Sequence, residues 1–267
     1  MNPNSKYSFA DLLDIMARLR APDGCPWDKE QTHESILSCL IEEAYEFVDA
    51  VERKDTPNMR EELGDLLLQV VFHAQMARET QSFDLDGVIQ ELCEKLVRRH
   101  PHVFGEQRLE KSGEVLVQWD EIKKKEKGTA AAVEHGALGE MPKHLPALLK
   151  ALKIQKRAAK TGFDWPDWKG PLAKINEELR EFEVEVAKGN SEEAAEELGD
   201  VLFSVVNLGR FLNVDPERAL AQTNAKFISR FKAMEKLAEQ RNSPLQQMNL
   251  EAMDALWNEV KTAEKAV

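Results

Sequence analysis

The sequence of 267 residues has little cysteine, and its three cysteines form no recognisable pair. Cys25, Cys39 and Cys93 contain no C-x-x-C spacing and are odd in number, so neither a disulfide framework nor a cysteine zinc site is indicated. A reduced, cytoplasmic protein is the simplest expectation. The first residues, MNPNSKYSFADLL, lack a basic segment followed by an apolar one, so no secretory signal is predicted.

Long hydrophobic runs and strand patterns are also missing. The longest apolar run, from Leu66 to Phe72, is interrupted by Gln69 and is much shorter than the roughly 20 residues of a membrane span. No segment alternates polar and apolar residues in the way that a half-buried strand does. We therefore expect an all-α protein that does not bind a membrane.

An excess of positive charge is the third absence. The formal net charge is −12, and the basic run at 123–125 is flanked by Glu121 and Glu126. Binding to a nucleic-acid polymer needs clustered Lys and Arg that neutralise phosphates, so that class of partner is not expected. With 42% hydrophobic and 31% charged residues, the composition is typical of a folded globular protein.

Helix signals cover most of the chain. Side chains able to cap a helix occur at Ser8, Thr32, Asp84, Ser191 and Asp215, the last directly before a proline. Thr56 is a further candidate, because Pro57 follows it in the first turn. The predicted helices run over about 8–20, 32–54, 56–80, 84–100, 114–127, 145–160, 171–188, 191–212, 216–241 and 249–264.

The stretch from Gly128 to Pro146 is rich in small residues and reads GTAAAVEHGALGEMPKHLP. Such a composition favours a connecting segment. We therefore predict an N-terminal domain over 1–127, a linker over 128–145 and a C-terminal domain over 146–267.

The two halves are related by an internal repeat. The block EELGD occurs at 61–65 and again at 196–200, and the apolar runs LLLQVV and VLFSVV follow the two copies. At the same offset of 135 residues, Glu42, Glu43 and Glu46 correspond to Glu177, Glu178 and Glu181. Lys95, Arg99, Trp119 and Lys123 also match Lys226, Arg230, Trp257 and Lys261, with slightly different offsets. The repeat predicts two tandem helical bundles.

The acids of the second repeat are predicted to meet across a helical hairpin. The turn is short and centres on residues 189–190, so the flanking helices should be antiparallel. Residues equidistant from the turn then come level, which pairs Glu181 with Glu197 and Glu178 with Asp200. Because positions i and i+3 or i+4 share a helix face, the two pairs lie one helical turn apart.

The first repeat has the same symmetry. About Lys54, Glu46 pairs with Glu62 and Glu43 pairs with Asp65. A single E-x-x-E on a helix is usually a solvated face, but two symmetric sets in one chain favour a site. We expect the apolar residues beside these acids to form the edge of a core, and they are Leu63, Leu66, Leu67, Val70, Leu198, Val201, Leu202 and Val205.

Carboxylates that face one another between helices repel strongly, and the repulsion needs an opposing charge. A hard divalent cation suits such an all-oxygen site, so we predict Mg²⁺, with Mn²⁺ as a substitute. Mg²⁺ often binds substrate phosphates as well. Lys226 and Arg230, four residues apart, are placed to hold phosphate charge, while Trp257 and Lys261 repeat that spacing and can stack a base and hold a phosphate.

The pattern EExxE followed by ExxD resembles the MazG family of nucleoside triphosphate pyrophosphohydrolases, in its two-domain bacterial form. The resemblance covers nearly the whole chain and extends to GCPWDKEQT at 24–32 and RRHPHVF at 98–104. It implies an all-α bundle, Mg²⁺ dependence, a homodimer, and cleavage of nucleoside triphosphates between the α and β phosphates with broad base selectivity. The products are a nucleoside monophosphate and pyrophosphate.

Carried over by position, the resemblance implies roles for individual residues. The expected Mg²⁺ ligands are Glu178, Glu181, Glu197 and Asp200, with Glu43, Glu46, Glu62 and Asp65 as a second site of the same kind. Glu177 is expected to help orient the attacking water. The expected substrate contacts are Lys174, Glu177, Glu178, Lys226, Arg230, Trp257 and Lys261.

The two repeats differ just before the acids. Lys174 lies one helical turn before Glu178 and can bind a phosphate, whereas the first repeat has Cys39 at the matching position. Ile41 likewise replaces Asn176. We therefore predict that the second repeat is the principal catalytic domain, and that the first is weaker or structural.

Two other functions remain open at this stage. A helical, acidic, duplicated chain can serve as an interaction scaffold without catalysis, and the first repeat fits that function best. A di-iron bundle needs two Glu-x-x-His motifs, and the one match, Glu30 to His33, precedes the acidic helix. The segment His100-Pro101-His102 is predicted to end a helix, because proline disturbs helical ligand spacing.

Overall fold

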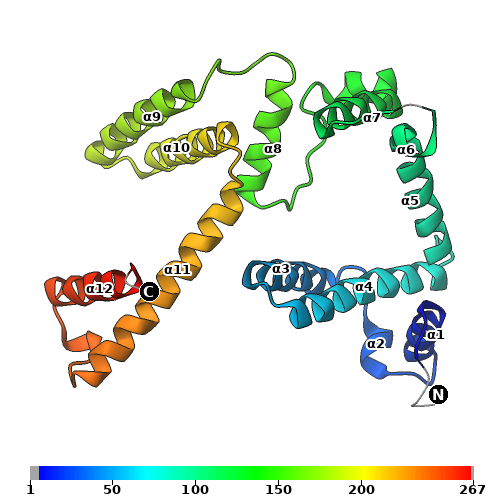
Figure 1. The fold of residues 1–267 in the computed structure, drawn as a ribbon, viewed down its shortest axis with the longest axis horizontal. Helices are drawn as coiled ribbons and strands as arrows, with labels where there is room; N and C mark the ends of the chain where they lie inside the picture. Colours follow the sequence, from blue (N-terminus) through cyan, green and yellow to red (C-terminus); the bar gives the residue numbers. More distant parts are fainter. Residues whose placement is uncertain (1–5, 107, 266–267) are drawn as a thin grey trace. The chain divides into compact units, whose positions relative to one another are not determined.

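The computed structural model describes residues 6–106 and 108–265, and of these the side chains of 124, 127–135 and 265 are left aside. The described residues form helices and no strand (Figure 1), which confirms the all-α prediction. None of the described helices is both long enough and apolar enough to cross a membrane. The chain divides into two compact units, Met1–Lys124 and Lys125–Val267, and each is described by itself.

The helices follow one another in a simple order. The first unit contains α1 (Phe9–Arg20), α2 (Pro26–Glu30), α3 (Leu37–Arg53), α4 (Thr56–Glu79), α5 (Leu85–Arg99), α6 (Pro101–Phe104) and the first half of α7 (Ser112–His135). The second unit contains the end of α7, α8 (Ala147–Ala159), α9 (Lys169–Lys188), α10 (Ser191–Phe211), α11 (Pro216–Gln240), the short 3₁₀ helix Leu245–Gln247 and α12 (Leu250–Lys265).

Three of the predicted caps are confirmed. Ser8 forms a capping box at the start of α1, in which its hydroxyl accepts from the Asp11 N–H and the Asp11 carboxylate accepts from the Ser8 N–H. Asp84 accepts from the Gly87 N–H at 2.9 Å, and Asp215 accepts from the Arg218 N–H at 3.0 Å. Each bond satisfies a backbone donor that has no partner inside the helix.

Three other helix starts differ from the prediction. Thr32 caps no long helix, because its hydroxyl accepts from the Ser35 N–H in a local turn and α3 begins only at Leu37. The short helix α2 before it is absent from the predicted helices. Asp55, rather than Thr56, caps α4 through the Asn58 N–H. At α10 the capping position is residue 190, so Ser191 is already inside the helix.

Both predicted helical hairpins are present. Helix α3 packs along α4, and α9 packs along α10. Each turn depends on one residue in the left-handed region, which is Lys54 at φ 56° in the first hairpin and Gly189 at φ 74° in the second. Glycine adopts this conformation without a steric cost, whereas a lysine there is uncommon. The turn positions therefore match the symmetry centres found in the sequence.

The predicted linker is partly helical. Helix α7 continues through its first part to His135, and Gly136 follows with φ 60°. Alanine has the highest helix propensity, and the run 130–132 consists of alanine, which explains why the helix extends further than its polar pattern indicates. The predicted domain limits at 127 and 146 stay predictions.

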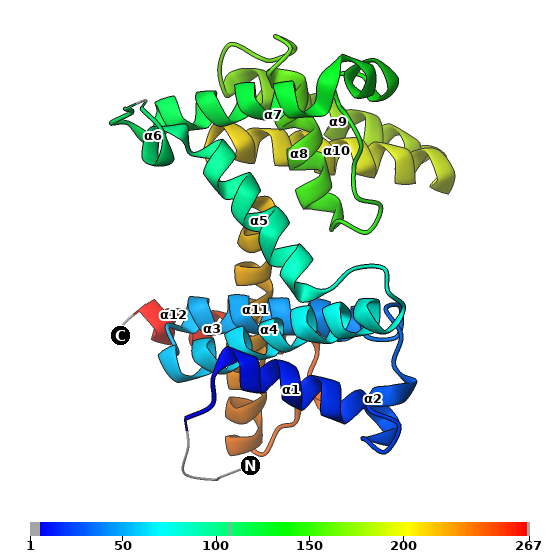
Figure 2. The ribbon, with the colours of Figure 1, turned by 90° about the vertical axis from the view of Figure 1, so that its right-hand side faces the viewer.

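Residues of α1, α4 and α5 form the core of the first unit. Met16, Val71, Phe72 and Leu85 are buried there, and α1 lies beside α4 (Figure 2). Arg20 is mostly buried above this core, with its guanidinium 5.3 Å from the centre of the Phe72 ring.

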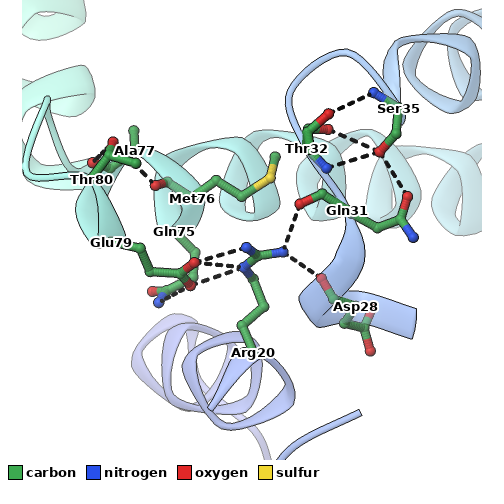
Figure 3. A network of polar contacts seen from close by, with 10 residues as sticks. All are labelled: Arg20, Asp28, Gln31, Thr32, Ser35, Gln75, Met76, Ala77, Glu79 and Thr80. Carbon is green, nitrogen blue, oxygen red and sulfur yellow. Dashed lines mark hydrogen bonds and ion pairs between the residues drawn. The ribbon is translucent and has the colours of Figure 1, made fainter. Parts of the chain in front are cut away.

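Arg20 also holds the segment GCPWDKEQT at 24–32 in place through hydrogen bonds to its backbone. Its guanidinium donates to both carboxylate oxygens of Glu79 at the end of α4. It donates as well to the backbone carbonyls of Asp28 and Gln31 (Figure 3). One buried cation thus joins α1, the segment 24–32 and α4, so this part of the resemblance has a structural role.

The second unit has α10 at its centre. Helix α8 packs against α10, and the Gln155 amide donates to the Phe203 carbonyl at 2.8 Å. Helices α11 and α12 pack against one another around Met234, Ala238 and Leu256. The main packing partners of α11 are therefore α12 and α8 rather than the α9/α10 hairpin.

The apolar stripe beside the acids is less buried than the prediction of a core edge implies, and of its residues only Leu66 and Val201 are half-buried. Leu63, Leu67 and Val70 on α4 are exposed, and so are Leu198, Leu202 and Val205 on α10. The amphipathic pattern therefore identifies an apolar face correctly, but this chain alone does not bury it.

We expect Phe72→Ala to destabilise the first unit by about 3–5 kcal/mol, because it leaves a cavity in a packed core and removes the ring below Arg20. Phe163→Ala is the matched control, since Phe163 is 83% exposed and Phe72 only 4%. The control should change the unfolding free energy by no more than about 0.5 kcal/mol. Urea denaturation followed by circular dichroism measures both, and equal losses would contradict the assigned core.

Candidate metal and nucleotide site

The α9/α10 hairpin brings the acids of the second repeat together. Glu178, Glu197 and Asp200 each offer a carboxylate oxygen, and these atoms lie within 4.8 Å of one another. Glu177, Glu178 and Glu181 on α9 form an overlapping group with the same spacing. We call these five residues the second acidic cluster. The structure thus juxtaposes the acids that the hairpin symmetry selects.

Burial and like charge act together in the second acidic cluster. Glu178 is only 4% exposed. The pKa of Glu197 is raised by burial, and the neighbouring charges of Glu181, Glu178 and Asp200 raise it further. The effect of Glu181 on Glu197 agrees with the predicted pairing of these two residues across the hairpin. The cluster therefore holds more negative charge than its surroundings balance.

One lysine partly offsets this charge. The Lys174 ammonium lies 2.8 Å from Glu177 Oε1 and 2.5 Å from Glu178 Oε1. The pKa of Lys174 is raised, chiefly by its hydrogen bond to Glu177 and next by its hydrogen bond to Glu178. The prediction that Lys174 faces the acids is therefore correct, and in this structure its partners are the acids themselves.

The first repeat forms a similar cluster on α3 and α4. Oxygens of Glu43, Glu62 and Asp65 lie within 4.8 Å of one another, and Glu62 is buried. We call these three residues and Glu46 the first acidic cluster. Burial raises the pKa of Glu43 and of Glu62, and Asp65 and Glu46 raise both further. Here Cys39 occupies the position that matches Lys174.

Both clusters fit a hard divalent cation. Their donors are carboxylate oxygens alone, at separations that a single ion can bridge. Acidic groups are common without a metal, but buried ones that raise one another's pKa are not ordinary solvated acids. In the second acidic cluster the oxygens that could hold one ion belong to Glu178, Glu197 and Asp200, and Glu181 belongs to the overlapping group on α9. The predicted four-residue ligand set, Glu178, Glu181, Glu197 and Asp200, stays a prediction.

The predicted phosphate and base contacts form a separate group on α11 and α12. The Arg230 guanidinium lies 5.9 Å from the centre of the Trp257 ring and donates to Glu264 at 2.7 Å. Phe227 packs against Trp257 at 5.1 Å between ring centres. Lys226 and Lys261 belong to the same two helices. Within one chain α11 and α12 pack against each other and α11 packs against α8, so their contacts with a nucleotide stay a prediction.

The first repeat holds an equivalent aromatic group. The Lys123 ammonium lies 5.8 Å from the centre of the Trp119 ring, and His100 meets that ring edge-on at 4.9 Å. His100 ends α5, as predicted for the segment 100–102, and His102 bonds to Gln118. The RRHPHVF segment therefore packs against the helix that carries Trp119.

Sequence reasoning missed one candidate element before α9. In the loop 161–168 the Asp164 carboxylate accepts hydrogen bonds from the two terminal guanidinium nitrogens of Arg210 on α10. The loop leaves Phe163 almost fully exposed, so it presents an aromatic ring from a fixed backbone. A signal was present, because the spacing Gly-x-x-Trp at 162–165 repeats the one at 24–27.

Comparison with known proteins identifies a family. The family described as MazG nucleotide pyrophosphohydrolase domain matches residues 31–104 and 170–235, once in each half. The sequence is 48% identical to the nucleoside triphosphate pyrophosphohydrolase/pyrophosphatase MazG of Thermotoga maritima over 96% of this chain and 97% of that protein. It is 45% identical to the nucleoside triphosphate pyrophosphohydrolase of Escherichia coli K12 over 95% of this chain and 97% of that protein.

A crystal structure of a mazG-related protein from Thermotoga maritima aligns with 43% of this chain and 98% of its own, at 33% identity and a TM-score of 0.39. The acids that converge in both hairpins lie inside the two matched ranges. Because the pattern recurs in each half and the relatives are similar over almost their whole length, this chain belongs to the MazG family of nucleotide pyrophosphohydrolases.

Proposed function

We propose that the protein hydrolyses nucleoside triphosphates, ATP among them, to the nucleoside monophosphate and pyrophosphate. The observation that carries this proposal is the convergence of Glu178, Glu197 and Asp200 across the α9/α10 hairpin. The relatives from Thermotoga maritima and Escherichia coli carry names for this activity. A pyrophosphate-release assay with a panel of NTPs and dNTPs, and with identification of the nucleotide product, tests it.

The MazG family depends on a divalent metal, and we propose Mg²⁺, with Mn²⁺ as a substitute. Bound to the acids, the ion would supply positive charge for the phosphates and would acidify the attacking water. Glu177 would accept a hydrogen bond from the attacking water and orient it toward the α phosphorus. The water oxygen would bond to the α phosphorus as the bond to the bridging oxygen breaks. Pyrophosphate would leave with that oxygen, and the proton of the water would pass to the Glu177 carboxylate and then to solvent.

The nucleotide also needs contacts beyond the acids. Lys174 is close enough to the cluster to reach a phosphate. We propose that Lys226 and Arg230 hold further phosphate charge, and that Trp257 stacks the base while Lys261 binds beside it. Since α11 and α12 do not pack on the α9/α10 hairpin of the same chain, a second copy of the chain is the natural source of these contacts.

A homodimer follows from the uncovered apolar face. Leu198, Leu202 and Val205 recur at helical spacing on α10 and are exposed beside the acids. A contiguous exposed apolar surface of this kind is typical of an interface. We propose that a second copy covers it, which would also exclude water from the acids and strengthen their hold on an ion. The three cysteines are free and fit a reducing compartment, the cytoplasm.

The first repeat has a second candidate function. It keeps the acids but has Cys39 in place of a lysine, and its Arg20 network is a structural device. We propose that the second repeat is the principal catalyst and that the first serves mainly as a scaffold. No turnover of any NTP or dNTP with Mg²⁺ would instead favour a scaffold role for the whole chain.

Separate Glu181→Ala and Glu46→Ala variants test this division of labour. We expect Glu181→Ala to lower kcat by more than the roughly 10–100-fold that loss of an outer-shell residue costs, because it removes a proposed ligand. Glu46→Ala should retain most of the turnover. Steady-state pyrophosphate release at saturating Mg²⁺ measures both, and equal losses in the two variants would refute the assignment.

Leu202→Asp tests the proposed dimer. A charge placed in the centre of an apolar interface is strongly unfavourable, so the variant should be monomeric at concentrations where the wild type is dimeric. Leu250→Asp is the control, because Leu250 is 79% exposed and lies at the start of α12. Light scattering coupled to gel filtration gives the masses. A wild-type monomer, or a Leu202→Asp dimer, would rule out this interface.

A further inference from the structure

Lys174 is bound by the same carboxylates that the proposed function assigns to the metal and the water. Its ammonium contacts Glu177 Oε1 and Glu178 Oε1, at 2.8 and 2.5 Å. Glu178 belongs to both groups of oxygens that could hold an ion, and its side chain is buried. The buried Glu178 carboxylate is therefore a possible partner of both the Lys174 ammonium and a metal ion, and these two positive charges would repel each other.

The geometry allows the lysine to leave. Its side chain is 39% exposed while that of Glu178 is only 5% exposed, so the ammonium approaches the cluster from the solvent side on a flexible four-carbon stem. Lys174 precedes Glu178 by four residues on α9, which keeps the released ammonium within reach of anything bound to the acids. Of the two partners, the exposed lysine is therefore the one with room to move.

We propose that Lys174 is an internal counter-ion that competes with the divalent metal ion for Glu178 and, once displaced, holds an oxygen of the triphosphate. The inference rests on the proposed function and deepens it, because it describes how the same site is regulated. Without nucleotide the tethered ammonium weakens metal binding. With nucleotide the lysine has a new anionic partner, so metal and triphosphate each favour the binding of the other.

Metal and triphosphate must affect each other equally: the factor by which the nucleotide raises the metal affinity equals the factor by which the metal raises the nucleotide affinity. It also distinguishes the two repeats. The first acidic cluster has Cys39 at the equivalent position and so has no tethered ammonium there. In this view the second repeat is the one whose metal affinity responds to substrate.

Titration with Mn²⁺ alone, followed by the electron paramagnetic resonance of the free ion, tests the competition. All variants carry E62Q, and the E62Q protein is the parent. This substitution removes a carboxylate from the first acidic cluster, so that Mn²⁺ binding is measured mainly at the second. We expect K174M to bind Mn²⁺ at least about fivefold more tightly than its parent, because a unit positive charge a few ångström from a divalent ion is removed. A purely structural role for Lys174 predicts unchanged or weaker binding.

Two controls isolate the local effect of the charge. K174R keeps the positive charge and should stay within about twofold of the parent. K169M removes a lysine from the same helix more than one turn away, and at about 1.5 Å of rise per residue its effect should also stay small. Thermal unfolding of each variant verifies that it is folded. If K174M binds Mn²⁺ no more tightly than the parent, or if neither protein binds it, Lys174 is not a competitor.

The second half of the proposal needs a nucleotide that is not cleaved. An α,β-methylene analogue of a nucleoside triphosphate should tighten Mn²⁺ binding in the parent by a larger factor than in K174M. Equal factors would overturn the coupling. If the wild type releases no pyrophosphate from any nucleoside triphosphate, the proposed function fails, while the titration with Mn²⁺ alone still decides whether Lys174 competes.

Discussion

Repulsion between carboxylates across a helical hairpin is the interaction on which the rest of the structure depends. A left-handed residue at each turn fixes the register of the two helices, so that acids on one helix face acids on the other. Glu178 is buried, and burial and neighbouring charges raise the pKa of Glu197. Such an arrangement destabilises the fold unless a cation is present, and proteins keep arrangements of this kind where function requires them.

The acids lie apart from the packed cores of the two units. Each unit has its own packed core, at Val71 and Phe72 in the first and at Met234 and Leu256 in the second. The hairpin faces that carry the acids lie outside these cores, with leucines and valines exposed beside them. This exposed face is the surface on which the proposed function places the substrate and a second copy of the chain.

Local sequence signals predict the helices and the acidic clusters well, because both depend on spacing along one or two adjacent helices. The symmetry about Gly189 is enough to place Glu178 beside Asp200. The prediction fails where a local turn competes with a helix cap, or where an apolar face stays exposed. Thr32 has the pattern of a helix cap but bonds to Ser35, and the apolar stripe has the pattern of a core edge that this chain does not supply. Periodicity identifies a face, whereas only tertiary structure says what covers it.

Crystals of the wild-type protein grown with Mn²⁺ and a non-cleavable nucleoside triphosphate analogue would show whether the acids hold a metal and a nucleotide. We expect an anomalous Mn²⁺ peak about 2.0–2.2 Å from carboxylate oxygens of Glu178, Glu181, Glu197 and Asp200, with the triphosphate bound against it. Anomalous density elsewhere, with these four side chains turned toward solvent and no nucleotide beside them, would contradict this expectation.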